Sequence, residues 1–181
     1  SKVYRAASAR VLPLSFKSFQ EKIRRINHMK NLTEFLQTSL TAYHACDNVK
    51  AALANQGFVR LHERADWNLS EGGKYYIVRG GSVIAFTVDS LDDFSYKIAA
   101  SHTDSPALKI KENALKRGEL YATLNTEPYG GGIWYSFFDR PLKIAGQVVV
   151  KKDSVLESRT VTSPFNVTIP SLAIHQNRGV N

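Results

Sequence analysis

The chain has 181 residues, of which 43% are hydrophobic and 22% charged, as in an ordinary globular protein of one or two domains. No apolar run approaches the roughly 20 residues that a membrane-spanning helix requires, so no membrane partner is expected. The single cysteine, Cys46, excludes an internal disulfide and a cysteine-based zinc finger, and we interpret it as a small buried hydrophobic residue. This cysteine usage suits a reducing compartment and predicts a cytoplasmic protein.

The net charge of +8 is concentrated in the first 30 residues, which hold eight Lys or Arg side chains against one acid. The rest of the chain is nearly neutral, so we expect no nucleic-acid partner, and a nucleic-acid-binding protein is supported only by this leader. Residues 1–28 have the composition of a transit peptide or of an extension added in cloning, and we favour the extension. Met29 is a plausible natural start.

Two helices are predicted at the beginning of the body. Apolar residues at three- and four-residue spacing indicate the first, from Asn31 onward. They are Leu32, Phe35, Leu36 and Leu40. The second is predicted to start after Asp47 as its N-cap and to end at Gly57. The side chains that we expect it to bury are Val49, Ala52 and Leu53.

Many strand-like segments follow these helices. They are 58–62, 74–80, 82–89, 96–102, 108–111, 119–125, 142–150 and 155–161. Hairpin turns are predicted at 79–82 and 151–154, and residues 170–181 are typical of the start of a helix. A helical pair ahead of many strands predicts an α/β or α+β fold with a strand-rich insertion.

The segment SHTDSP at 101–106 is the most informative stretch for chemistry. The predicted strand at 96–102 ends on His102, and Asp104 follows two residues later. Ligands collect at the carboxyl ends of strands in open α/β sheets. An imidazole there can bind zinc while the carboxylate orients its ring. Taken alone, the pair leaves open a purely structural histidine.

Four longer motifs occur in succession: SHTDSPALKIK, EPYGGGIWYSFFDRPLKIAGQVVVK, LESR and IPSLAIHQNR. Together with TAYHA at 41–45, they resemble the aspartyl aminopeptidase family in order and approximate spacing, over 29–181. The resemblance implies a zinc-dependent hydrolase, with two zinc ions per complete active site, that removes N-terminal and often acidic residues from peptides. It also implies a large homo-oligomer that assembles through an inserted domain.

The fold implied by the resemblance is α/β, a zinc-peptidase catalytic domain with a strand-rich inserted dimerisation domain. We therefore divide the chain into a leader at 1–28, the first part of the catalytic domain at 29–106 and the first part of the insert at 107–181. Carried over by motif, His102 would be a zinc ligand and Asp104 the catalytic acid that orients it. His175 would reach an active site from the insert, as a zinc ligand or as a substrate contact. A core histidine is the alternative for His175.

The chain also departs from the family pattern, because that pattern places further carboxylate ligands, a distal His and the general-base Glu downstream of residue 181. We therefore expect the 181-residue chain alone to be an inactive fragment. The alternative is a non-catalytic oligomerisation or regulatory module derived from the same fold. The Gly-rich stretch 130–132 lacks the Lys-Ser/Thr of a phosphate loop and predicts a tight bend in a domain hinge. Asp139 and Arg140 are interpreted as structural polar pairing at a turn.

Overall fold

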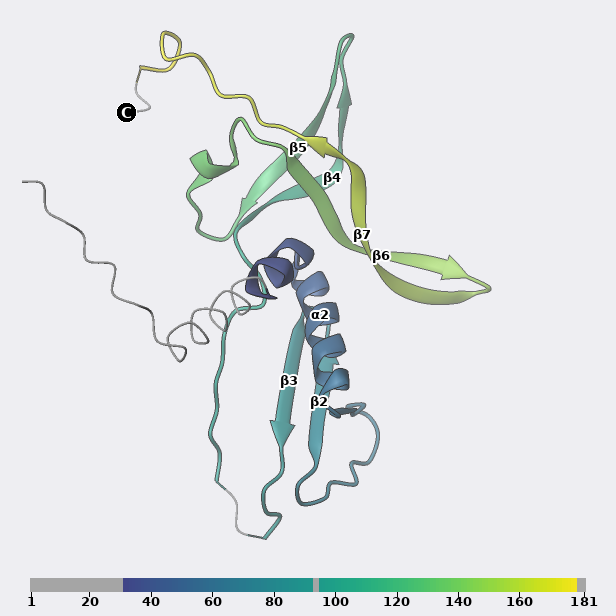
Figure 1. The fold of residues 1–181 in the computed structure, drawn as a ribbon. Coiled ribbons are helices and arrows are strands. Elements are labelled where there is room, and N and C mark those ends of the chain that lie inside the picture. Colours follow the sequence, from purple (N-terminus) through teal and green to yellow (C-terminus); the bar gives the residue numbers. More distant parts are fainter. Residues whose placement is uncertain (1–30, 93–94, 179–181) are drawn as a thin grey trace, which may run out of the picture. The chain divides into compact units, whose positions relative to one another are not determined.

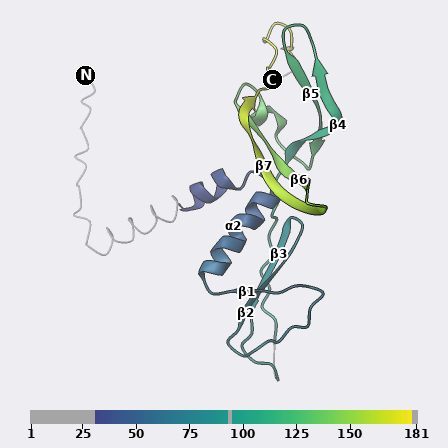
Figure 2. The ribbon, with the colours of Figure 1, turned by 90° about the vertical axis from the view of Figure 1, so that its right-hand side faces the viewer.

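A computed structural model describes residues 31–92 and 95–178 (Figures 1 and 2). The expectations for the leader 1–28 and for the end of the 170–181 segment lie outside this part of the chain. The chain divides into two units, Ser1–Gln37 and Thr38–Asn181. The described part of the first unit, 31–37, is helical, which confirms the helix predicted from Asn31.

Helix α2 spans Ala42–Asn55 and begins six residues earlier than it would with Asp47 as its N-cap. Thr41 is its N-cap: this residue has an extended backbone, and its hydroxyl accepts a hydrogen bond from the His44 N–H. The predicted N-cap Asp47 was wrong, because this carboxylate lies inside the helix and bonds Lys50 and Thr160 instead. The helix ends before Gly57, whose φ of +79° permits the predicted stop.

The residues that α2 buries lie nearer its N-terminus than predicted. Ala45 and Cys46 are 5% and 2% exposed, which confirms the interpretation of Cys46 as a small buried residue. Val49 and Leu53 are only half-buried, and Ala52 is exposed. Ala45 and Val49 are one turn apart and lie on the same side of the helix. Burial on this side is therefore greatest in the first half of the helix and decreases towards its C-terminal end.

A three-stranded sheet follows, in the order β1 (Val59–Arg60), β2 (Lys74–Arg79) and β3 (Ser82–Thr87). β1 pairs with β2 in parallel, and β2 pairs with β3 as the hairpin predicted at 79–82. Gly80 has a φ of +55° at the first central position, as a type II′ turn requires. Tyr75 and Tyr76 are both 7% exposed, and since neighbours in a strand face opposite sides, both faces of β2 are covered.

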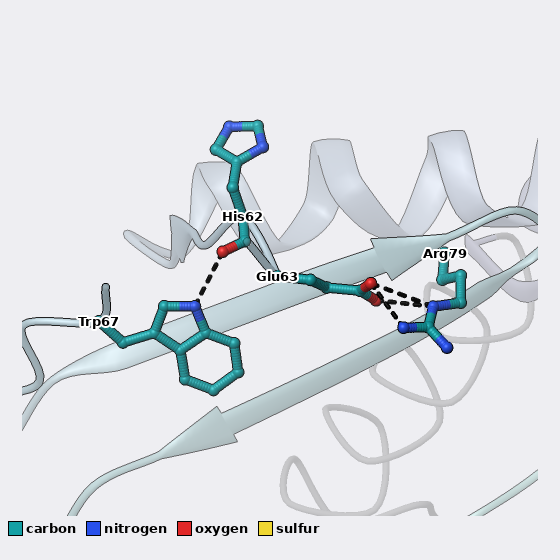
Figure 3. A network of polar contacts seen from close by, with 4 residues as sticks. All are labelled: His62, Glu63, Trp67 and Arg79. Carbon is teal, nitrogen blue, oxygen red and sulfur yellow. Dashed lines mark hydrogen bonds and ion pairs between the residues drawn. The ribbon is translucent and has the colours of Figure 1, made fainter. Parts of the chain in front are cut away.

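Two polar contacts order the loop after β1, one to strand β2 and one within the loop, and Figure 3 shows both. Arg79 binds both carboxylate oxygens of Glu63, with its Nε 2.9 Å from Oε1 and its terminal nitrogen 2.6 Å from Oε2. The indole N–H of Trp67 donates to the His62 carbonyl at 2.9 Å. Because the Arg79–Glu63 pair is solvent-exposed, it orients the loop more than it stabilises the fold.

Two antiparallel hairpins make up the second half of the described chain. The first pairs β4 (Ala107–Arg117) with β5 (Ala122–Tyr129), and an irregularity lies between Ile110 and Leu115. The second pairs β6 (Leu142–Lys152) with β7 (Val155–Val167). Asp153 and Ser154 both have positive φ at its tip, which matches a type I′ turn and confirms the hairpin predicted at 151–154. A short 3₁₀ helix, η1 (Trp134–Phe137), lies between the hairpins.

Two predicted elements are absent from the described residues. The segment 96–102 is not a strand, and Tyr96 and Ile98 are 78% and 85% exposed. A strand needs a second strand for its backbone N–H and C=O groups, and no strand of the described part of the chain pairs with this segment. Residues 170–178 form a turn at 174–176 rather than a regular helix. β4 begins at Ala107, where the predicted insert begins; the division into two domains stays a prediction.

The buried hydroxyl of Tyr75 supports the first testable prediction. Its oxygen accepts a hydrogen bond from the Ser70 N–H at 3.0 Å and lies 3.1 Å from the Ser70 hydroxyl. Tyr75→Phe should lower the free energy of unfolding by about 1–2 kcal/mol, because the Ser70 N–H loses its partner in a half-buried place. Urea denaturation measures this change, and Tyr135→Phe, at a side chain 57% exposed, is the control. An equal effect in both variants would contradict the role given to the Tyr75 hydroxyl.

Asp47 gives a prediction for pH. The hydrogen bond from Lys50, with a smaller contribution from Thr160, lowers the pKa of Asp47 against the opposing effect of burial. A carboxylate with a lowered folded pKa contributes stability above its unfolded pKa and loses it as the pH falls through the folded pKa. The unfolding free energy of the wild type should therefore fall more steeply below about pH 4 than that of Asp47→Asn. Asp66→Asn, at an exposed acid, is the control and should follow the wild type.

Candidate functional site

The segment from His102 to Pro106 lies between β3 and β4 and leads directly into the first hairpin. Ala107, the first residue of β4, pairs with Tyr129, the last residue of β5. The register of this hairpin therefore brings Tyr129 beside Asp104, although the two lie 25 positions apart. His102 is delivered by extended chain rather than by the strand predicted at 96–102.

Asp104 accepts hydrogen bonds on both of its carboxylate oxygens. Its Oδ1 lies 2.9 Å from His102 Nδ1, and its Oδ2 accepts the Tyr129 hydroxyl at 3.0 Å. These bonds, the one to His102 first and the one to Tyr129 second, hold the pKa of Asp104 below its ordinary value. The same carboxylate raises the pKa of Tyr129. Asp104 is therefore an ionised acceptor at neutral pH.

An ionised Asp104 fixes which nitrogen of a neutral His102 carries the proton. A carboxylate can only accept, so the imidazole donates from Nδ1. The lone pair then lies on Nε2, and the His102 side chain is 92% exposed. This arrangement is the one that metal-binding histidines use, with one ring nitrogen on a carboxylate and the other available to the ion.

The fit to a zinc ion is partial. His102 and Asp104 have the chemistry of a ligand and its orienting acid, but a catalytic zinc takes three protein ligands. Within 31–92 and 95–178, no three His, Cys, Asp or Glu side chains are grouped so that they could hold a metal ion. In particular, the structure does not gather His102, Asp104 and His175 into such a group.

His175 lies in the turn at 174–176, and its side chain is exposed. Asp139 fixes the start of this segment, because its carboxylate accepts the backbone N–H and the hydroxyl of Ser171. These bonds lower the pKa of Asp139. Asp139 is thus structural, as predicted, although its partner is Ser171, and Arg140 donates separately to the Ser136 carbonyl.

The glycines at 130–132 lie close to Pro106, at the end of the segment that carries His102 and Asp104. Gly130 has a φ of +77°, which confirms the tight bend predicted there. A Cβ on Gly132 would lie 3.0 Å from the Pro106 Cβ, so the loop passes close to Pro106. An open hollow of about 570 Å³ lies beside it, lined by Pro106, Gly131, Gly132, Ile133, Ser136 and Phe137. The bend therefore adjoins Pro106, two residues after Asp104.

Sequence reasoning missed Tyr129. The residue stands in EPYGGG, where the aromatic side chain alone predicts no role in a metal site. Its proximity to Asp104 follows from the pairing of Ala107 with Tyr129. The signal that could have found it is the register of the hairpin, which the irregularity between Ile110 and Leu115 conceals from strand counting.

Residues 35–181 match the sequence model of the family described as aminopeptidase I zinc metalloprotease (M18). The chain belongs to this family. This confirms the family resemblance drawn from the motifs around His102 and His175. Members are described as zinc metalloproteases, so the zinc expected from the motifs agrees with the family.

Individual M18 relatives are similar over most of the chain. It is 44% identical over 160 residues to the probable M18 family aminopeptidase 2 of Clostridium acetobutylicum, which covers 84% of this chain and 37% of the relative. It is 37% identical over 176 residues to the aspartyl aminopeptidase 4 of Saccharomyces cerevisiae, which covers 93% of this chain and 36% of the relative. The chain thus spans little more than a third of the length of these curated relatives.

The fold is also similar to that of solved aminopeptidases. A cryo-EM structure of the Ape4 and Nbr1 complex matches with a TM-score of 0.75 and 35% identity, over 81% of this chain and 29% of that chain. The M18 aminopeptidase of Thermotoga maritima matches with a TM-score of 0.68 and 29% identity, over 87% of this chain and 35% of that chain. The mixed helix and strand fold is therefore that of M18 aminopeptidases.

Proposed function

We propose that this chain is part of a zinc-dependent aminopeptidase that removes N-terminal residues, acidic ones in particular, from peptides. The observation that carries the proposal is the bond between His102 Nδ1 and Asp104, in a chain whose residues 35–181 match a zinc metalloprotease family. The names of the aspartyl aminopeptidase relatives support the acidic preference.

In this proposal His102 binds zinc through Nε2, and Asp104 keeps the proton on Nδ1 so that the lone pair stays directed to the ion. When bound, zinc polarises the scissile carbonyl and lowers the pKa of the attacking water. The negative charge of Asp104 lies on the other side of the imidazole from the metal, and it raises the basicity of the ligating nitrogen. Two ions per complete site need further ligands, which we assign to other parts of the full-length protein.

The second half of the chain suits assembly. We assign 107–181 to an inserted domain through which the enzyme forms a homo-oligomer. Its β6–β7 hairpin leaves several large apolar side chains exposed, which a second copy could cover. They are Val148, Val149, Val155, Leu156 and Val161.

For location, we propose the cytoplasm, on the evidence of the free buried thiol of Cys46. Among the described residues, no helix is both long and apolar enough to cross a membrane.

One observation favours a second candidate. Because the described residues hold no group of three metal-binding side chains, a non-catalytic oligomerisation or regulatory module would have the same structure. The two candidates differ in what the full-length protein does with zinc and with a peptide.

His102→Ala in the full-length protein tests the first candidate. The variant should lose zinc and release no acidic residue from a model peptide, because a ligand is removed. Asp104→Asn should keep more metal but lose about 10–100-fold in metal affinity or activity, as changes next to a ligand do. His62→Ala, at another exposed histidine, is the matched control and should behave as wild type. Full zinc content and activity in His102→Ala would overturn the ligand assignment, and a full-length wild type without either would favour the module.

His175 is predicted to serve the active site of a neighbouring subunit. It follows the whole run of strands assigned to the insert, and a twofold contact presents such residues to the partner reciprocally. His102→Ala and His175→Ala should each be inactive alone. After dissociation and joint reassembly, activity should return, because a mixed pair holds one site with both histidines intact. No recovery would place both histidines in sites of their own chain. Full activity of His175→Ala alone would support a structural histidine outside the active site, which in the described residues has an exposed side chain.

A further inference from the structure

We propose that Tyr129 is a positioning residue for the metal ligand His102, acting through Asp104. A carboxylate that accepts on one oxygen can still rotate about its Cβ–Cγ bond. Asp104 accepts on both, with His102 Nδ1 at Oδ1 and the Tyr129 hydroxyl at Oδ2. The second bond fixes the carboxylate plane and with it the direction of the bond to the imidazole.

The need for such a device follows from the surroundings of His102. The ring is 92% exposed, and residues 95–102 have no regular secondary structure, so packing does not orient it. Tyr129, in contrast, ends a strand and pairs with Ala107 across the hairpin. Gly130, which comes next, turns the chain at once, and a Cβ there would lie 3.6 Å from the Pro106 Cα. Strand pairing thus fixes the backbone that carries the Tyr129 side chain.

This chain of contacts couples two regions that we assign to different domains. Tyr129 belongs to the predicted insert, whereas His102 and Asp104 belong to the predicted catalytic part. The β4–β5 hairpin would therefore set the orientation of a ligand in the other domain. The role given to Tyr129 rests on the proposed function only in that His102 is taken to bind zinc.

Tyr129→Phe in the full-length protein tests the assignment, with Tyr121→Phe as the matched control. Tyr121 comes immediately before the first residue of β5, whereas Tyr129 is its last, and Tyr121 is 73% exposed. Tyr129→Phe should lower zinc affinity by about 3–10-fold, less than a change to Asp104 itself, and should lower kcat with KM unchanged. In an Asp104→Asn background the same change should have no further effect, because two residues that act in series are not additive.

A measurement without zinc or substrate separates this proposal from the proposed function. In zinc-free protein at a pH where His102 is neutral, ¹⁵N shifts of its ring should show the Nδ1–H tautomer in the wild type and in Tyr121→Phe. Tyr129→Phe should shift the ring toward the Nε2–H tautomer, and 4-aminophenylalanine at position 129, which keeps an N–H donor, should restore it. O-methyltyrosine, which lacks the donor, is a second loss variant if the Phe variant does not fold.

Unchanged tautomer and zinc affinity in the loss variants, or additive losses with Asp104→Asn, would overturn the positioning role. A tautomer shift in Tyr129→Phe combined with full zinc content in His102→Ala would instead uphold the positioning of the ring and refute zinc binding by His102. Failure of the positioning role and failure of zinc binding by His102 therefore give different results.

Discussion

Backbone pairing between neighbouring strands, rather than a shared apolar core, holds most of the described chain together. Within 31–92 and 95–178 the buried apolar side chains are few: Ala45, Cys46, Tyr75, Tyr76 and Ala114. The three sheets are small, and two of them are single hairpins. A lone two-stranded hairpin is marginal in water. The arrangement of β4–β5 and β6–β7 therefore calls for further surfaces to cover them, from the rest of a longer protein or from a second copy.

The same constraint explains why position at a strand end matters at the candidate site. Where packing is sparse, side chains keep their direction mainly through hydrogen bonds and through the strands that carry them. Asp104 receives one bond from an exposed ring and one from a hydroxyl at the end of β5. The paired strand is the firmer of the two supports. The order at this site thus comes from the register of Ala107 with Tyr129 rather than from burial.

Elements fixed by local chemistry were predictable, and those that depend on distant partners were not. The turn at Gly80 follows from a residue that tolerates positive φ, and the hairpin at 151–154 follows from the two strand-like runs on either side of it, so both hairpins were predicted correctly. The strand expected at 96–102 has suitable residues but lacks a neighbour among the described residues. Asp47 resembles a helix cap in sequence, yet its carboxylate is used by Lys50 and by Thr160, a residue 113 positions away.

The candidate site also combines features that follow from local sequence with features that depend on distant residues. His102 and Asp104 are two residues apart, so a hydrogen bond between the imidazole and the carboxylate could be predicted from their spacing. The direction of the bond to His102 depends on a further contact, because the Tyr129 hydroxyl bonds the second oxygen of Asp104. A short motif therefore predicts which two side chains meet, while the direction in which they are held depends on Tyr129, a residue 25 positions away from Asp104. For the same reason His175 has a residue type and a place in the chain, but its partners depend on surfaces beyond a single hairpin.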